Sequence, residues 1–159
     1  MDPKVHEAVL DYLSTVCATL TGYVNACESP IEQLFLIALE KIAYKERLGS
    51  RDFVWASQYH IPSTKFRVDF ILMAMDGEFT KCAAVECDGH DFHEKTKAQA
   101  AYDKQRDRFF TRKGLPVFHY TGSEIWNDAY RCAREVFDYL YDRIHEAQGT
   151  HAAAEEMHR

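Results

Sequence analysis

The sequence predicts an α/β fold in which helices flank a small mixed sheet. Two segments with helical spacing come first, three strand-like segments follow, and a helix, a strand and a closing helix complete the chain. The 159 residues and 47% hydrophobic content are ordinary for one globular domain. We therefore expect a single domain over residues 1–148, with its core at about 29–147.

The first two elements are predicted helices. Residues 4–20 place apolar side chains near helical spacing, and Ser29, Pro30 and Glu32 give the second helix an N-cap, a first-turn proline and an S-x-x-E capping box. This second helix is expected to run to about Lys45. The helix at 4–20 is expected to pack on the core, with contact to a partner or a second copy as the alternative. Core positions of the second helix are Phe35, Leu36, Leu39 and Ile42.

Three strands are predicted next. Residues 53–61 are rich in aromatic and β-branched residues and stop at Pro62. The segments 65–75 and 81–88 are largely apolar, and the turn signal at 76–78 lies between them. The last two strands should therefore form a hairpin.

The remaining chain is predicted to alternate helix and strand. A helix over 95–113 precedes a strand at 115–120, and a long closing helix covers 123–147 with Ser123 as its N-cap. Residues 149–159 are expected to be a frayed tail. The apolar stripe of the closing helix includes Ile125, Trp126, Tyr130, Val136, Phe137, Leu140 and Ile144.

Composition limits the cellular setting. The sequence lacks a run of apolar residues long enough for a bilayer and a signal-peptide layout at its start, so we expect no membrane partner. Five scattered cysteines, an odd number, favour reduced thiols in a cytoplasmic protein.

Charge is distributed unevenly along the chain. The formal net charge is -6, but residues 95–113 carry seven Lys and Arg against two Asp, a local charge of +5 that leaves -11 for the rest. The basic segment is compatible with a surface that faces phosphates and equally with a solvated helix face.

Three carboxylates are predicted to meet near the end of the hairpin. Glu86 and Asp88 share one face of the third strand, and Asp69 on the second strand can lie across from them. Unpaired buried carboxylates are costly and repel one another unless a cation lies among them. A hard cation such as Mg²⁺ fits this donor set, and a site formed by all three is favoured over a purely structural cluster.

Several side chains near this cluster have two readings each. Asp69 can instead form a buried ion pair with Arg67 or Arg106, and Arg106 can reach either an acidic side chain or a phosphate. Glu32 is explained by its capping box, but it also lies on the core-facing side of its helix, so its carboxylate can point toward the site. His93 is a candidate proton carrier. A zinc site from Cys82, Cys87, His90 and His93 is disfavoured, because positions 82 and 87 face opposite sides of a strand.

Four motifs in this order resemble the very-short-patch-repair-like branch of the PD-(D/E)XK nuclease superfamily. The similarity covers most of the chain, from Ser29 to the closing helix, and is closest to small stand-alone endonuclease-like domains. It implies the restriction-endonuclease-like αβββαβ core. The motifs are SPIEQLF at 29–35; Gln58, Ile61, Val68, Asp69 and Phe70; Glu86, Asp88, Gly89 and His93; and Asp103, Arg106 and Asp107.

The resemblance implies a DNA endonuclease that uses Mg²⁺, for which Mn²⁺ can substitute. Asp69, Glu86 and Asp88 are the expected metal ligands, and His93 and Glu32 complete the expected catalytic set. Asp88 stands where the superfamily carries a lysine, so the residue that activates water is unassigned, with Lys97 or Lys104 as alternatives to His93. The residues expected to contact DNA are Lys97, Lys104, Arg106 and Arg67.

Two further functional classes stay open. One is a non-cleaving nucleic-acid-binding or regulatory module that keeps the nuclease fold, and the other is a globular protein whose acidic cluster is structural. The sequence contains no separate DNA-recognition motif, so we expect target choice to depend on the domain's own loops, on a homodimer or on a protein partner.

Overall fold

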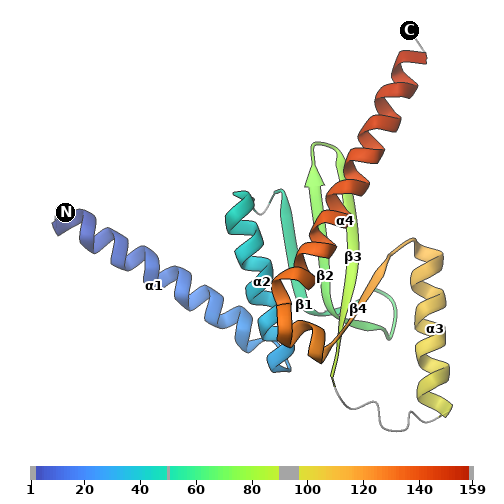
Figure 1. Ribbon diagram of the computed structural model, residues 1–159, viewed down its shortest axis with the longest axis horizontal. Helices are drawn as coiled ribbons and strands as arrows, with labels where there is room; N and C mark the ends of the chain where they lie inside the picture. Colours follow the sequence, from blue (N-terminus) through green and yellow to red (C-terminus); the bar gives the residue numbers. More distant parts are fainter. Residues whose placement is uncertain (1–2, 50, 90–96, 158–159) are drawn as a thin grey trace.

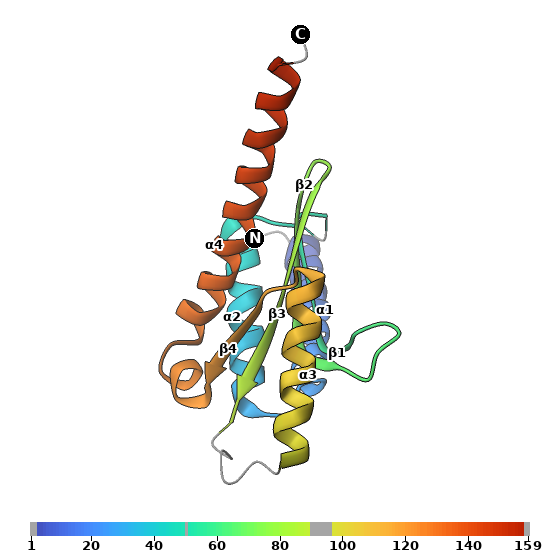
Figure 2. The same cartoon turned by 90° about the vertical axis from the view of Figure 1, so that its right-hand side faces the viewer.

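A four-stranded mixed sheet lies between helices on both of its faces in the computed structural model, which describes residues 3–49, 51–89 and 97–157 (Figures 1 and 2). The α/β class and the small mixed sheet are confirmed. The strand order is β1-β2-β3-β4, with β1 to β3 antiparallel and β4 parallel to β3. The elements are α1 (Pro3–Asn25), α2 (Pro30–Glu46), β1 (Phe53–His60), β2 (Arg67–Asp76), β3 (Phe79–Asp88), α3 (Lys97–Lys113), β4 (Val117–Thr121) and α4 (Gly122–Met157).

The main core fills the space between the sheet and the helices α2 and α4. Fully buried side chains from all three layers meet there, and the predicted core positions of α2 are among them. A smaller cluster covers the opposite face, where Phe66, Val68 and Ala84 meet Phe110 of α3. The helix α3 connects β3 to its parallel neighbour β4, so the chain must cross the sheet here, and this crossover brings α3 over the ends of β2 and β3.

The start of α2 follows the predicted capping box. Ser29 has extended backbone angles, its Oγ accepts a hydrogen bond from the Glu32 backbone N–H at 3.3 Å, and the Glu32 carboxylate accepts one from the Glu28 backbone N–H at 2.9 Å. The helix ends at Arg47, which adopts the left-handed conformation of a C-cap with φ of 58°.

The start of α4 corrects the predicted N-cap. Thr121, not Ser123, caps the helix: the Glu124 backbone N–H donates to Thr121 Oγ1 at 3.3 Å, and Glu124 Oε2 accepts from the Thr121 backbone N–H at 2.9 Å. The sequence T-G-S-E is itself a capping box, and it begins the helix directly at the end of β4.

The end of α4 also differs from the prediction. The helix continues to Met157, through most of the segment 149–159 that was expected to fray. Side-chain contacts with the β2–β3 hairpin explain the extension: Gln148 donates to Asp76 at 3.0 Å, and the ring of His151 packs on Phe79.

The position of α1 contradicts the expectation that this helix packs on the core. It extends away from the sheet, and only Leu20 and Val24, near its C-terminal end, pack against the main core (Figure 1). Nearly all of its other described side chains are exposed. No helix in the described part of the chain combines the length and apolarity needed to cross a bilayer. The five cysteines, all described, are free thiols, as predicted.

Candidate functional site

The candidate site lies where β2 and β3 separate. Their antiparallel pairing ends at Phe70 and Val85, and continuing this register places Asp69 beside Glu86, as the predicted hairpin requires. At this point the Asp69 side chain takes the place of a main-chain partner, because its Oδ2 accepts a hydrogen bond from the Cys87 backbone N–H at 2.7 Å. The carboxylate is thereby fixed between the two strands.

A local irregularity in the sheet sets the direction of this carboxylate. Val68 packs in the cluster under α3 and Phe70 in the main core, so the usual alternation of faces is broken at Asp69. On β1, Gln58 has a φ of 50° and is skipped in the register between the flanking pairs to Val68 and Phe70. Asp69 is skipped on β2 as well, so neither strand has an extra residue, and the irregularity is a local break in the ladder and not a β-bulge.

Glu86 is the most deeply buried of the three predicted metal-binding carboxylates, with 8% of its surface exposed. Arg106 Nη1 lies 3.0 Å from Glu86 Oε1, which is close enough for an ion pair. The contact is not aligned as a hydrogen bond, however, and Glu86 Oε1 and Arg106 Nε are both buried without a hydrogen-bond partner. Burial raises the pKa of Glu86 to about 7, although the charge of Arg106 opposes the shift; the charges of Asp69 and Asp88 add to it. At this site the cost of burying the charge of Glu86 therefore outweighs the attraction of Arg106.

Asp69 shows the same imbalance. Burial raises the pKa of its carboxyl group, the hydrogen bond from the Cys87 backbone opposes the shift, and the charge of Glu32 adds to it. Arg67 and Arg106, the two predicted partners of Asp69, pair with Glu28 and Glu86 instead. The predicted ion pair of Asp69 with either arginine is therefore wrong.

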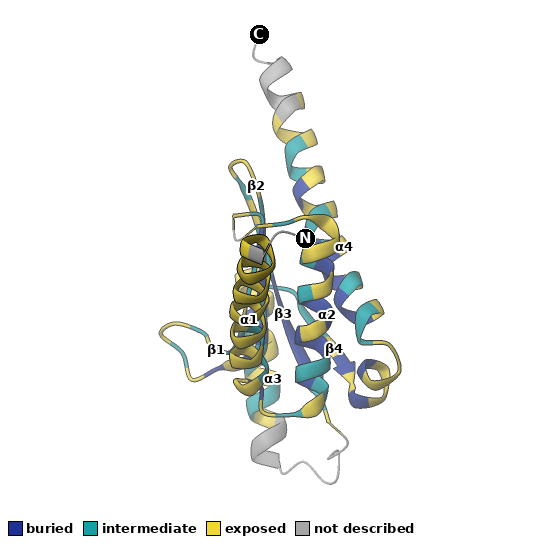
Figure 3. Ribbon diagram, turned by 90° about the vertical axis from the view of Figure 1, so that its left-hand side faces the viewer, coloured by how far each residue is buried: buried dark blue, intermediate teal, exposed yellow. Residues whose placement is uncertain are grey.

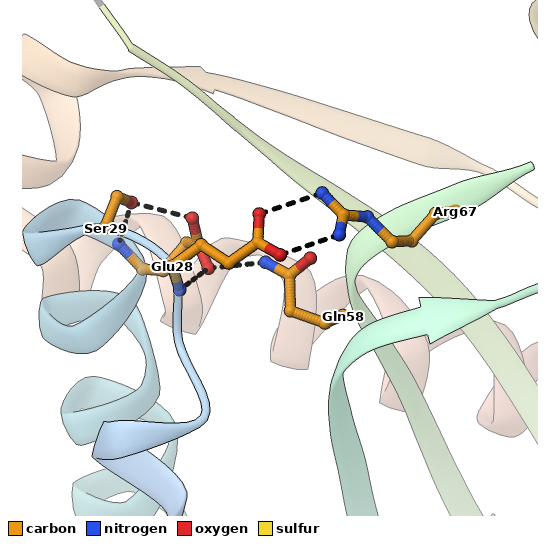
Figure 4. A network of polar contacts seen from close by, with 5 residues as sticks. Glu28, Ser29, Gln58 and Arg67 are labelled. Atoms are coloured by element: carbon orange, nitrogen blue, oxygen red, sulfur yellow. Dashed lines mark hydrogen bonds and ion pairs between the residues drawn. The ribbon is translucent and has the colours of Figure 1, made fainter.

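Glu32 reaches the site from α2, but donors surround its carboxylate. It is buried, Oε1 accepts from the Ser29 hydroxyl at 2.7 Å, and Oε2 accepts from Gln58 Nε2 at 2.6 Å (Figure 4). Glu32 therefore has its capping role and also anchors Gln58, whose backbone φ is positive and which lies opposite the Asp69 region of β2. From the sequence, Gln58 was only one of the motif residues that carry the resemblance and had no expected role at the site.

An exposed ion pair lies beside this network. Both carboxylate oxygens of Glu28 accept from the Arg67 guanidinium, at 2.7 and 2.9 Å (Figure 4). Arg67, predicted to contact DNA, is thus paired within the chain, and Glu28 was missed because it precedes α2 and is far from β2 in the sequence.

Asp88 lies at the outer end of β3 and is half-exposed. Its Oδ2 is 3.3 Å from Nδ1 of His119, a residue of β4 that the sequence did not single out. The parallel pairing of β3 and β4 brings the two together, and no local pattern indicates it.

Trp126 differs from its predicted place in the apolar stripe of α4. Its side chain is 69% exposed and lines a pocket of about 530 Å³ with Gly89 and Gly122, next to the end of β3. The kink at Asp128, whose φ is -158° and ψ 77°, separates the first turns of α4 from the rest and changes the direction of the stripe there.

The predicted DNA-contacting cations lie in different environments. Lys104 is exposed on α3 together with Arg108 and Arg112, whereas Arg106 faces inward to Glu86. Lys97 begins α3, but its side chain, like the whole of His93, is outside the described part of the chain.

The donor set suits a hard cation only in part. Among the described residues, no three acidic, histidine or cysteine side chains lie close enough together to hold a metal ion. Asp69 and Glu86 are left as two candidate ligands, a number compatible with Mg²⁺, which uses one or two protein carboxylates and completes its shell with water and substrate phosphate. The buried Glu86 oxygen without a hydrogen-bond donor is the observation that favours such a ligand. No family model, curated protein or solved structure matches this chain.

Proposed function

We propose that this chain is a DNA endonuclease that depends on Mg²⁺ or Mn²⁺, built on a restriction-endonuclease-like core. The observation that carries the proposal is the pair of Glu86, which is buried, and Asp69, which is partly buried, two carboxylates whose pKa values are raised at the open end of the β2–β3 hairpin. Keeping such groups away from water is costly, and a binding function for a cation offsets the cost.

A surface suited to the DNA backbone lies on α3, the helix whose inner face packs against the candidate site. The helix α3 presents Lys104, Arg108 and Arg112 to solvent at intervals of four residues, so the three cations share one helix face. On its inner face the same helix carries Arg106, which lies against Glu86. Phosphates bound along the outer face would therefore lie about one helix diameter, ~10 Å, from the carboxylates.

Each residue has a distinct part in the proposed reaction. Asp69, held by the Cys87 backbone, and Glu86 would bind Mg²⁺, which polarises the scissile phosphate and lowers the pKa of water. Asp88 would add a carboxylate at the outer rim, and Glu32 fixes Gln58 behind the site. Arg106 would turn from Glu86 to the phosphate. His93 remains the proposed proton carrier.

The test is cleavage of supercoiled plasmid and of mismatched and single-stranded DNA, with Mg²⁺, Mn²⁺ or EDTA. We expect Asp69→Ala and Glu86→Ala to lose at least ~10³-fold in activity with the fold retained. Glu78→Ala, an exposed carboxylate in the turn at the far end of the hairpin, is the matched control and should cleave normally. Full activity of Glu86→Ala would show that the site is wrong.

Thermal unfolding provides a second readout that does not depend on cleavage. Mg²⁺ should raise the Tm of the wild type more at pH 8 than at pH 5.5, because the metal binds the ionised form of Glu86, whose pKa is about 7. Glu86→Gln should abolish the shift. An equal shift in Glu86→Gln would place the metal elsewhere.

The ion pair of Arg106 with Glu86 favours a second candidate, a non-cleaving nucleic-acid-binding module. In that function the arginine would be a permanent structural partner of the carboxylate. DNA binding that is unaffected by EDTA, together with no cleavage of any substrate and no Tm shift with Mg²⁺ or Mn²⁺, would support this candidate over the nuclease.

A further inference from the structure

The outer part of α1 exposes an apolar surface that nothing in the described chain covers. Val5, Val9, Leu13 and Val16 are each between 41 and 52% exposed, and the burial colouring shows most of the helix as exposed (Figure 3). Scattered exposed apolar residues are ordinary, but a continuous set along one helix marks an interaction site.

These side chains form one face. At 100° per residue, Val9, Leu13 and Val16 align with Leu20 and Val24, the two residues of α1 that pack against the main core. The exposed stripe therefore continues a seam that is already buried at its C-terminal end. The charged residues of the helix, Lys4, Glu7 and Asp11, all lie on the opposite side.

The charges of α1 indicate what covers the stripe. Residues 12–25 contain no charged side chain, although the chain as a whole carries a net charge of -6. Two copies of an acidic protein repel each other least where their surfaces are uncharged, so a neutral apolar face suits self-association. A membrane surface fits less well, because helices that lie on membranes carry Lys and Arg on the polar face, and here Glu7 and Asp11 outnumber Lys4.

We propose that α1 is a dimerisation arm whose apolar face packs against a second copy of this chain. The helix has 23 residues. Its uncovered stripe from Val5 to Val16 is about 18 Å long, and two such faces, each somewhat under half of the helix surface, bury roughly 500 Å² in total. The α1 stripe alone is therefore smaller than a stable interface, which buries at least about 1,000 Å² in total.

A groove next to α1 enlarges the available surface. Tyr23, at the C-terminal end of α1, lines a groove of about 660 Å³ together with Tyr44 of α2 and Trp55 of β1. Tyr44 is 86% exposed, and β1 is an edge strand of the sheet. In the proposed dimer the contact extends from the α1 stripe into this groove, which supplies the further area that a stable interface needs.

The experiment is sedimentation equilibrium of the intact chain at micromolar concentrations, with circular dichroism to check the fold. The wild type should sediment at twice the chain mass of 18.4 kDa. Leu13→Glu should raise the dimer dissociation constant by at least ~100-fold, because it places two unpaired carboxylates in the apolar contact. Leu13 is half-exposed in the single chain, so its replacement should leave helicity and Tm unchanged.

Ala18→Glu is the matched control, since it adds the same charge to the opposite, exposed face of α1 and should leave the dimer intact. A monomeric wild type, a Leu13→Glu dimer as tight as the wild type, or an Ala18→Glu variant as weak as Leu13→Glu would each overturn the proposal. So would a monomeric chain that binds anionic phospholipid vesicles through α1. This test does not measure DNA cleavage, so its outcome is independent of the proposed nuclease activity.

Discussion

Replacing Arg106 by Met removes the only cation that pairs with the Glu86 carboxylate among the described residues and keeps a side chain of similar length. The variant should change stability in a way that depends on pH. Glu86 has a folded-state pKa of about 7, above the 4.5 of an exposed glutamate. A carboxyl group with a raised pKa contributes stability that is fully present below the unfolded pKa and is lost as pH rises through the folded pKa.

The free energy of unfolding of the wild type should therefore fall by about 3 kcal/mol between pH 4.5 and 7 as Glu86 ionises, since one pKa unit corresponds to roughly 1.4 kcal/mol. Arg106 lowers the pKa of Glu86, so Arg106→Met raises it beyond 7 and the loss continues above that pH. By pH 8.5 the free energy of unfolding of the variant should fall by a further ~2 kcal/mol. This loss corresponds to a fall in Tm of about 4–8 °C for a chain of this size.

The assay is thermal unfolding followed by circular dichroism from pH 5 to pH 8.5. At pH 5 Glu86 is protonated in both proteins, and the variant should be as stable as the wild type or slightly more stable, because it no longer buries an unpaired guanidinium. The double variant Arg106→Met with Glu86→Gln should show no added pH dependence. A loss of equal size at pH 5 and pH 8.5 would refute the reasoning, since it would trace the effect to packing.

Two other substitutions test separate parts of the chain. Ser29→Ala removes the hydroxyl that caps α2 and holds Glu32, so urea unfolding should show a loss of about 1 kcal/mol, whereas no loss would mean that Gln58 alone keeps Glu32 in place. His93→Ala should lower kcat by ~10²–10⁴-fold with little change in DNA affinity measured by anisotropy, and the opposite pattern, weaker binding with unchanged turnover, would make His93 a phosphate contact.

The fold was largely predictable because its signals are local. The capping box at Ser29 and Glu32, the turn at 76–78 and the apolar periodicity of α2 each depend on residues a few positions apart, and the structure has all three features. Element ends were less accurate. The S-x-x-E pattern at α2 and the T-x-x-E pattern at Thr121 carry the same signal, but the second was overlooked beside Ser123.

The sequence by itself determined which elements form, and that Asp69 and Glu86 would lie near each other at the end of a hairpin. Only the tertiary structure decided their partners: Arg106 for Glu86, the Cys87 backbone for Asp69, and Glu28 for Arg67. Helix caps and strand alternation arise from interactions over three or four residues, whereas these partners come from elements up to 39 positions apart, and several acceptors compete for each arginine. The same reason explains α1: its apolar face predicted a helix, but which surface covers that face depends on how the whole chain, and a second copy of it, are arranged.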